Sequence, residues 1–136
     1  MKDPQKEGKR WLMQAVHDLE LASYDFQGGF YAAACFNAQQ TTGKALKGFL
    51  LAKGERVVLG HSVAELIQRC ETYESSFAHL RSRAGKLDRF YLPTRYPNSL
   101  PGGIPSEVFD KEDAEGALQV AAEVVERARE LIGEVG

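Results

Sequence analysis

Apolar residues recur at helical spacing over most of the chain, and the first such stretch covers residues 4–26. Its apolar positions lie three and four residues apart with charged residues between them, which is typical of a helix with one buried face. Pro4 suits the first turn, and Gly28 and Gly29 suit the end, because glycine readily takes the left-handed C-cap conformation. The predicted inner face comprises Leu12, Ala15, Val16, Leu19, Ala22 and Phe26.

A second helix is predicted over residues 30–53, where Gly54 ends it. Residues 30–36 are apolar nearly all round, which predicts either the central helix of the fold or a helix that meets a partner subunit. The inner face would hold Cys35, Ala38, Thr42, Ala45, Leu46 and Phe49. A polar face away from this stripe is either solvated or helps to line a site. That face consists of Gln40, Lys44 and Lys47.

Two more helices are predicted over residues 62–73 and 75–92. The first begins with a capping box, in which the Ser62 side chain accepts from the Glu65 amide and the glutamate reaches back to the cap. The second stops before Pro93, which lacks an amide hydrogen and restricts the residue before it. Its inner face would hold Phe77, Leu80, Ala84, Leu87 and Tyr91.

The last helix is predicted from Asp110, which caps it, to about Ile132. Prolines and glycines over residues 97–105 predict a loop before it. No segment shows the alternation of a strand, so the predicted fold is all-α. We expect an antiparallel up-and-down bundle of four long helices plus a shorter one, with residues 1–136 forming one domain.

The composition narrows the functional classes. A formal charge of −2 argues against a protein that coats nucleic acid by bulk electrostatics. Cys35 and Cys70 fall in apolar helical patterns and are interpreted as buried thiols of a cytoplasmic protein rather than a disulfide or a metal pair. No signal peptide and no apolar run of about 20 residues is found, which predicts no membrane association. Neither a phosphate loop nor zinc-ligand spacing occurs, so no metal or cofactor is expected.

The residues that stand out lie around the end of the fourth predicted helix. Arg89, Tyr91, Arg95 and Tyr96 combine two guanidinium groups with two phenols. Arginine binds phosphate through two parallel hydrogen bonds, and tyrosine can stack on a base. The alternative is structural: Tyr91 would finish the core stripe, Tyr96 would plug the end of the bundle, and the arginines would pair with the acidic last helix.

The chain resembles the HEPN family (higher eukaryotes and prokaryotes nucleotide-binding domain) over nearly its whole length. The resemblance rests on the order and spacing of several short motifs. These are Trp11 with Ala15, Asp18, Leu19 and Ala22; Gly29-Phe30-Tyr31; Gln39-Gln40 with Lys44-Ala45-Leu46-Lys47; His61-Ser62; and Leu87-Asp88-Arg89-x-Tyr91-x-Pro93-Thr94-Arg95-Tyr96-Pro97.

This resemblance implies an antiparallel helical bundle, commonly a homodimer, that binds a nucleotide or RNA. It also implies a partner, because many members are encoded beside a minimal nucleotidyltransferase and several act as RNase toxins. The catalytic motif of the family is an arginine followed four to six residues later by a histidine. Counted from Arg89, those positions hold Thr94 and Arg95 here, so the usual general base is missing. Gly43 replaces a glutamate usual in relatives, and close packing would be one reason for a glycine there.

Three hypotheses follow. The first is a nucleotide- or RNA-binding protein of a toxin–antitoxin-like pair, whose dimer forms a cleft lined by Arg89, Tyr91, Arg95 and Tyr96, with Lys44, Lys47 and His61 as contributors. The second is a weak metal-independent RNase, in which Arg89 and Arg95 hold phosphate while His61 or Tyr96 moves protons. The third is a non-catalytic interaction module without a ligand.

Overall fold

The computed structural model describes residues 3–133, and within them the chain is helical without any strand, which confirms the all-α prediction. The α-helices are α1 (Pro4–Gln27), α2 (Tyr31–Ala52), α3 (Val63–Tyr73), α4 (Arg81–Gly85), α5 (Pro105–Val108) and α6 (Lys111–Ile132). Three 3₁₀ helices lie at Ser75–Leu80 (η1), Lys86–Phe90 (η2) and Pro97–Ser99 (η3). None of the described helices is both long and apolar enough to cross a bilayer.

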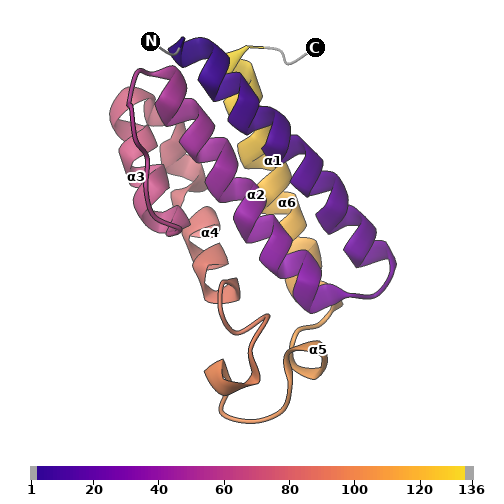
Figure 1. Cartoon of the computed structure of the whole chain (residues 1–136). Helices are drawn as coiled ribbons and strands as arrows, with labels where there is room; N and C mark the ends of the chain where they lie inside the picture. The colour runs from indigo at the N-terminus through magenta and orange to yellow at the C-terminus, as the bar shows by residue number, and fades with distance from the viewer. Residues whose placement is uncertain (1–2, 134–136) are drawn as a thin grey trace.

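Helix α2 occupies the middle of an antiparallel bundle. It packs along α1 and α6 on one side and contacts α3 and η2 on the other (Figure 1). Its whole predicted inner face is buried, from Cys35 to Phe49. Of the two interpretations of its apolar first half, the structure supports the central helix, although Phe30 just before it is exposed.

Helices α1 and α2 approach closely through paired glycines. A Cβ added at Gly8 would lie 2.7 Å from the Gly48 carbonyl oxygen, and one at Gly48 would lie 2.9 Å from the Gly8 oxygen. Neither position can therefore hold a side chain without moving backbone. Close packing, the one reason considered above for Gly43, does not explain that glycine. A Cβ there would meet only Leu66 Cδ1, at 4.0 Å.

The fourth predicted helix is present as three short pieces, η1, α4 and η2, rather than one long helix. Because a 3₁₀ turn has three residues instead of 3.6, the step from Leu87 to the next inward position reaches Phe90. Phe90 is 3% exposed and packs edge-on against Phe109, whereas Tyr91 is only half-buried. The prediction that Tyr91 completes the core stripe is therefore wrong, and its ring is available for other contacts.

The chain between η2 and α6 extends beyond the end of the bundle (Figure 1). One turn of helix, α5, begins at Pro105, the last residue of the predicted loop. Asp110 then caps α6 in a full capping box with Asp113, as the sequence predicted for the cap. This connection brings residues 91–96 close to the start of α2.

Both cysteines are fully buried free thiols, as predicted. Burial, reinforced by the nearby Asp113 carboxylate, raises the pKa of Cys35 to about 12. Burial also raises the pKa of Cys70. Neither thiol is therefore ionised at neutral pH.

Candidate functional site

The carboxylate of Asp88 fixes the start of α3. Asp88 Oδ1 accepts from the Val63 amide at 2.7 Å, while Oδ2 accepts from the Ala64 amide at 3.1 Å and the Ser62 hydroxyl at 2.9 Å. The Ser62 oxygen also accepts from the Glu65 amide, as expected for a cap. Among the residues described, Glu65 does not complete the predicted capping box. A carboxylate from another segment binds the free amides instead.

Gln39 on α2 extends this network to the loop before α3. Its side-chain nitrogen donates to the His61 carbonyl oxygen at 2.8 Å and to Asp88 Oδ1 at 3.2 Å. Its oxygen accepts from Gln40 at 2.9 Å. Residue 61 is therefore held by its backbone, which leaves the imidazole ring of His61 exposed and free to make ring contacts.

The ring of Tyr91 contacts two other rings. The His61 imidazole stacks on it with centroids 5.2 Å apart and planes 22° from parallel. Phe36 of α2 contacts it at 6.2 Å in a tilted arrangement. Three segments that are distant in sequence therefore meet at one phenol.

Arg95 lies against these aromatic rings. Its guanidinium carbon is 4.2 Å from the Phe36 centroid, 4.8 Å from that of Tyr91 and 5.1 Å from that of Tyr96. Arg95 Nε donates to the Tyr91 carbonyl oxygen at 2.9 Å, and the neighbouring Thr94 hydroxyl donates to the Phe90 carbonyl. Cation–π contact and one backbone hydrogen bond thus orient the guanidinium. We call Phe36, His61, Tyr91, Arg95 and Tyr96 the Arg95 cluster.

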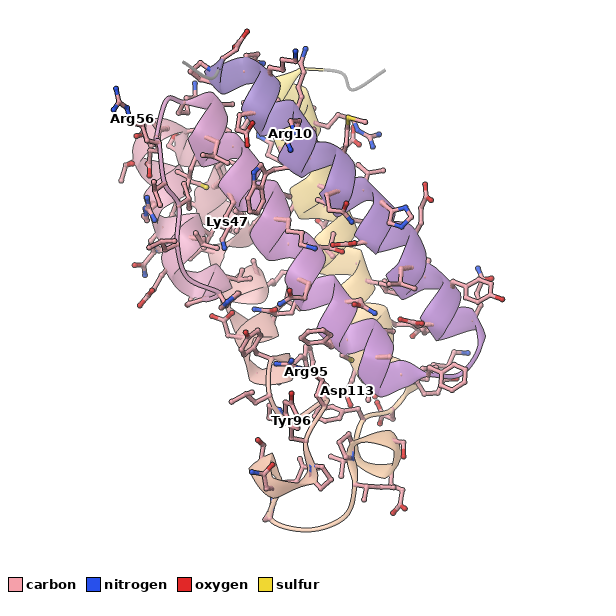
Figure 2. The ribbon with its side chains drawn as sticks, in the orientation of Figure 1. Arg10, Lys47, Arg56, Arg95, Tyr96 and Asp113 are labelled. Carbon is pink, nitrogen blue, oxygen red and sulfur yellow. The ribbon has the colours of Figure 1, made fainter. Side chains whose placement is uncertain are left out.

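The charge of Arg95 is not neutralised within the described chain. Among residues 3–133, neither Arg95 nor Arg89 forms an ion pair with a carboxylate, whereas Arg83 pairs with Glu123 of the acidic last helix. Tyr96 is 48% exposed, so it does not plug the bundle. Figure 2 shows Arg95 and Tyr96 next to each other near the start of α2. The specific structural roles considered for Tyr96 and the two arginines, a plug of the bundle end and ion pairs with the last helix, are therefore not those in the structure.

A small pocket of about 160 Å³ adjoins the cluster and shares His61 with it. We call it the lysine pocket. It lies between α1, α2 and the loop before α3, and its lining includes Trp11, Gln40, Gly43, Lys44, Lys47 and His61. The polar face predicted on α2 thus lines a hollow. Lys44 pairs with Asp18 at 2.6 Å, and Lys47 lies over the Trp11 ring at 5.7 Å.

Arg89 lies outside the Arg95 cluster. Its guanidinium lies over the Phe90 ring at 4.8 Å, and it lines a different hollow with Lys86, Glu112 and Asp113. Of the predicted site residues, Tyr91, Arg95, Tyr96 and His61 therefore lie together in the Arg95 cluster. Lys44 and Lys47 lie with His61 in the lysine pocket. The structure places Arg89 elsewhere.

The sequence interpretation missed several residues of this region. Phe36 stands next to the buried Cys35 and fits simply as part of an apolar run. Asp88 is the one acid in a basic segment, which was a usable signal for a specific partner. Gln39 and Trp11 were noted only as part of the family resemblance, because their roles depend on contacts across the bundle.

The family model of the HEPN domain matches the sequence of this chain over residues 9–131. This chain belongs to the HEPN domain family. The match includes all of the Arg95 cluster and the lysine pocket. A candidate toxin of Methanocaldococcus jannaschii is 27% identical to this HEPN protein over 137 aligned positions, which cover 95% of this chain and 90% of that one.

Solved structures of other proteins share the fold of this chain. A crystal structure from Thermus thermophilus is 37% identical, with a TM-score of 0.86, and the match covers 92% of this chain and 98% of that chain. An archaeal HEPN homologue is 33% identical, with a TM-score of 0.77 and coverage of 98% and 100%. A Thermotoga maritima HEPN domain protein is 26% identical, with a TM-score of 0.72 and coverage of 93% and 99%.

Proposed function

We propose that this HEPN protein binds a nucleotide or single-stranded RNA at the Arg95 cluster. The observation that supports this most directly is the Arg95 guanidinium, which is oriented by three rings and one carbonyl and has no carboxylate partner in the described chain. Such a group can donate two parallel hydrogen bonds to a phosphate. The half-exposed Tyr96 ring beside it offers a stacking surface for a base.

The proposal extends to a toxin–antitoxin-like pair with a minimal nucleotidyltransferase, and to a homodimer. The similarity to a candidate toxin supports the first part. Exposed large apolar side chains at the end of the bundle that carries the 91–110 connection support the second, because such groups favour protein contacts. They are Phe30, Leu92, Tyr96, Ile104 and Val108. Co-purification with the product of an adjacent gene and sedimentation analysis test the two parts.

The test of ligand binding is an equilibrium titration of ATP and of a short RNA against wild type, Arg95→Ala and Arg56→Ala. Arg56 is a matched control, because it is also exposed and its side chain points away from the bundle (Figure 2). We expect Arg95→Ala to weaken binding roughly tenfold or more, since charge-assisted hydrogen bonds contribute most there. Circular dichroism should show unchanged helicity. If Arg95→Ala and Arg56→Ala bind equally well, the cluster is not the site.

A second function, metal-independent RNA cleavage, has one specific observation in its favour. His61 stacks on Tyr91, and Arg95 lies over the same ring, so an imidazole and a phosphate-binding group both contact one side chain. An imidazole can serve as the general base at a ribose hydroxyl. Cleavage in EDTA that disappears in His61→Ala supports this function. If Arg95→Ala and His61→Ala change only the melting temperature, the interaction module remains.

A further inference from the structure

The lysine pocket carries an excess positive charge. Asp18, which is 8% exposed, offsets Lys44 through an ion pair at 2.6 Å and also accepts from Gln14. Lys47 has no carboxylate ion pair among residues 3–133 and lies over Trp11 instead. Burial, followed by repulsion from Lys44, lowers the pKa of Lys47. A bound anion would offset both effects, burial and repulsion, that disfavour the charged form of the Lys47 ammonium group.

Gly43 keeps space open in this pocket. A glycine inside a helix costs about 1 kcal/mol relative to alanine. No close backbone approach explains it, because a Cβ at this position would find Leu66 Cδ1 at 4.0 Å as its nearest neighbour. The missing side chain instead leaves room beside Lys44 and Lys47. Gln40, which uses one amide hydrogen on Gln39, retains a second one as a donor.

The size and walls of the pocket limit what can enter. Its volume of about 160 Å³ is well below the roughly 300–1,000 Å³ of pockets that enclose a whole drug-sized ligand. It therefore suits a single small group. Its lining comes from α1, α2 and the loop at residues 60–61, so a ligand meets protein on three sides. Such a pocket fits the end of an RNA strand better than an internal part of an RNA strand that passes through it.

We propose that the lysine pocket binds a terminal phosphate monoester of the same RNA whose base lies at the Arg95 cluster. A monoester carries nearly two negative charges at neutral pH, against one for an internal diester, and lysine binds phosphate as a point charge. His61 lines the pocket and stacks on Tyr91 at 5.2 Å, so the two binding regions are contiguous. This inference rests on the proposed function and adds selectivity for a phosphorylated RNA end.

Calorimetric titration of three unlabelled oligoribonucleotides of one sequence tests it. One has a 5′-phosphate, one has a 3′-phosphate, and one has hydroxyls at both ends. We expect wild type to bind one phosphorylated form roughly tenfold more tightly than the hydroxyl form. The comparison of the two phosphorylated forms identifies which end enters the pocket.

Two variants separate the outcomes. Lys47→Met keeps an unbranched side chain over Trp11 but removes the charge, so it should bind all three oligomers with the affinity that wild type shows for the hydroxyl form. Lys53→Met is the matched control, because Lys53 also lies over an aromatic ring, Phe49 at 5.5 Å, outside the pocket. It should keep the preference. Equal binding of all oligomers by wild type, or a preference that survives Lys47→Met, overturns this inference alone. Binding of none overturns the RNA-binding part of the proposed function as well.

Discussion

Asp88 Oδ1 accepts a hydrogen bond of 2.7 Å from the Val63 amide, so a residue of η2 caps a helix that begins 25 positions earlier. The same carboxylate binds Ser62, Ala64 and Gln39. It therefore links α2, α3 and η2 next to His61. The geometry of the Arg95 cluster depends on this link, because His61 provides one of the rings stacked on Tyr91.

Replacing Asp88 should destabilise the protein more than replacing the local cap. In Asp88→Ala, two backbone amides and Gln39 lose a charged acceptor, for which we expect a loss of about 2–3 kcal/mol in the free energy of unfolding. Ser62→Ala removes an N-cap side chain, with an expected loss of about 1 kcal/mol. Urea denaturation of both variants checks the order. A smaller loss for Asp88→Ala than for Ser62→Ala would contradict the assignment of Asp88 as the main anchor.

The same substitution should have opposite effects at two glycines of α2. Gly43→Ala should stabilise the protein by about 0.5–1 kcal/mol, because alanine favours the helix and no atom of a neighbouring element lies closer than 4.0 Å to its Cβ. Gly48→Ala should destabilise it by about 1–3 kcal/mol, because its Cβ would lie 2.9 Å from the Gly8 oxygen. Thermal unfolding of the Gly43→Ala and Gly48→Ala variants measures the sign of each effect. Shifts of equal sign would argue against this packing.

The two buried thiols should make stability fall in alkali. Their pKa values are raised from an ordinary value of about 9, that of Cys35 to about 12, so the folded state keeps protons that the unfolded state loses. The contribution of the thiols to stability is complete below pH 9 and is lost as pH rises from there towards 12. Denaturation midpoints across this range should fall less steeply in a Cys35→Ala, Cys70→Ala variant than in wild type. Parallel curves would contradict this prediction. Neither native thiol should react with a disulfide reagent at neutral pH.

Tyr91 should act through its ring rather than its hydroxyl. Its ring meets His61, Phe36 and Arg95, and its carbonyl accepts from Arg95. Tyr91→Phe should therefore keep both stability and RNA affinity. Tyr91→Leu should lose about 1 kcal/mol of stability, typical of an aromatic pair, and should weaken binding because Arg95 is less well oriented. Equal affinities of the two variants would show that the ring does not position Arg95.

Local sequence patterns were sufficient for much of the fold. Both ends of α1 follow from Pro4 and from Gly28 and Gly29, the end of α2 follows from Gly54, and the start of α6 follows from Asp110. The division of the fourth helix was not foreseen, because inward steps of three and four residues fit a 3₁₀ turn nearly as well as an α turn. That ambiguity misplaced Phe90 and Tyr91.

The candidate site was less accessible to sequence reasoning. The chemistry of Arg95, Tyr91 and Tyr96 was visible, as were the lysines of α2. Their grouping was not, because it depends on Asp88 and Gln39 fixing the loop that carries His61. Arg89 has the same chemistry as Arg95, yet it lies over Phe90 in another hollow. The residue types suggested phosphate binding for both arginines. Only the path of the backbone shows that Arg95, and not Arg89, lies in the Arg95 cluster.

Binding of RNA at the Arg95 cluster can be observed directly by a nuclear magnetic resonance titration of the isotope-labelled protein with a short single-stranded RNA. The Arg95 Nε–H signal and the ring signals of Tyr91 and Tyr96 should shift together and saturate with the ligand. The Nε–H signals of Arg89 and Arg56 should stay in place. Shifts confined to Arg89, Lys86 and Arg83, with Arg95 unchanged, would contradict the central claim that the Arg95 cluster is the binding site.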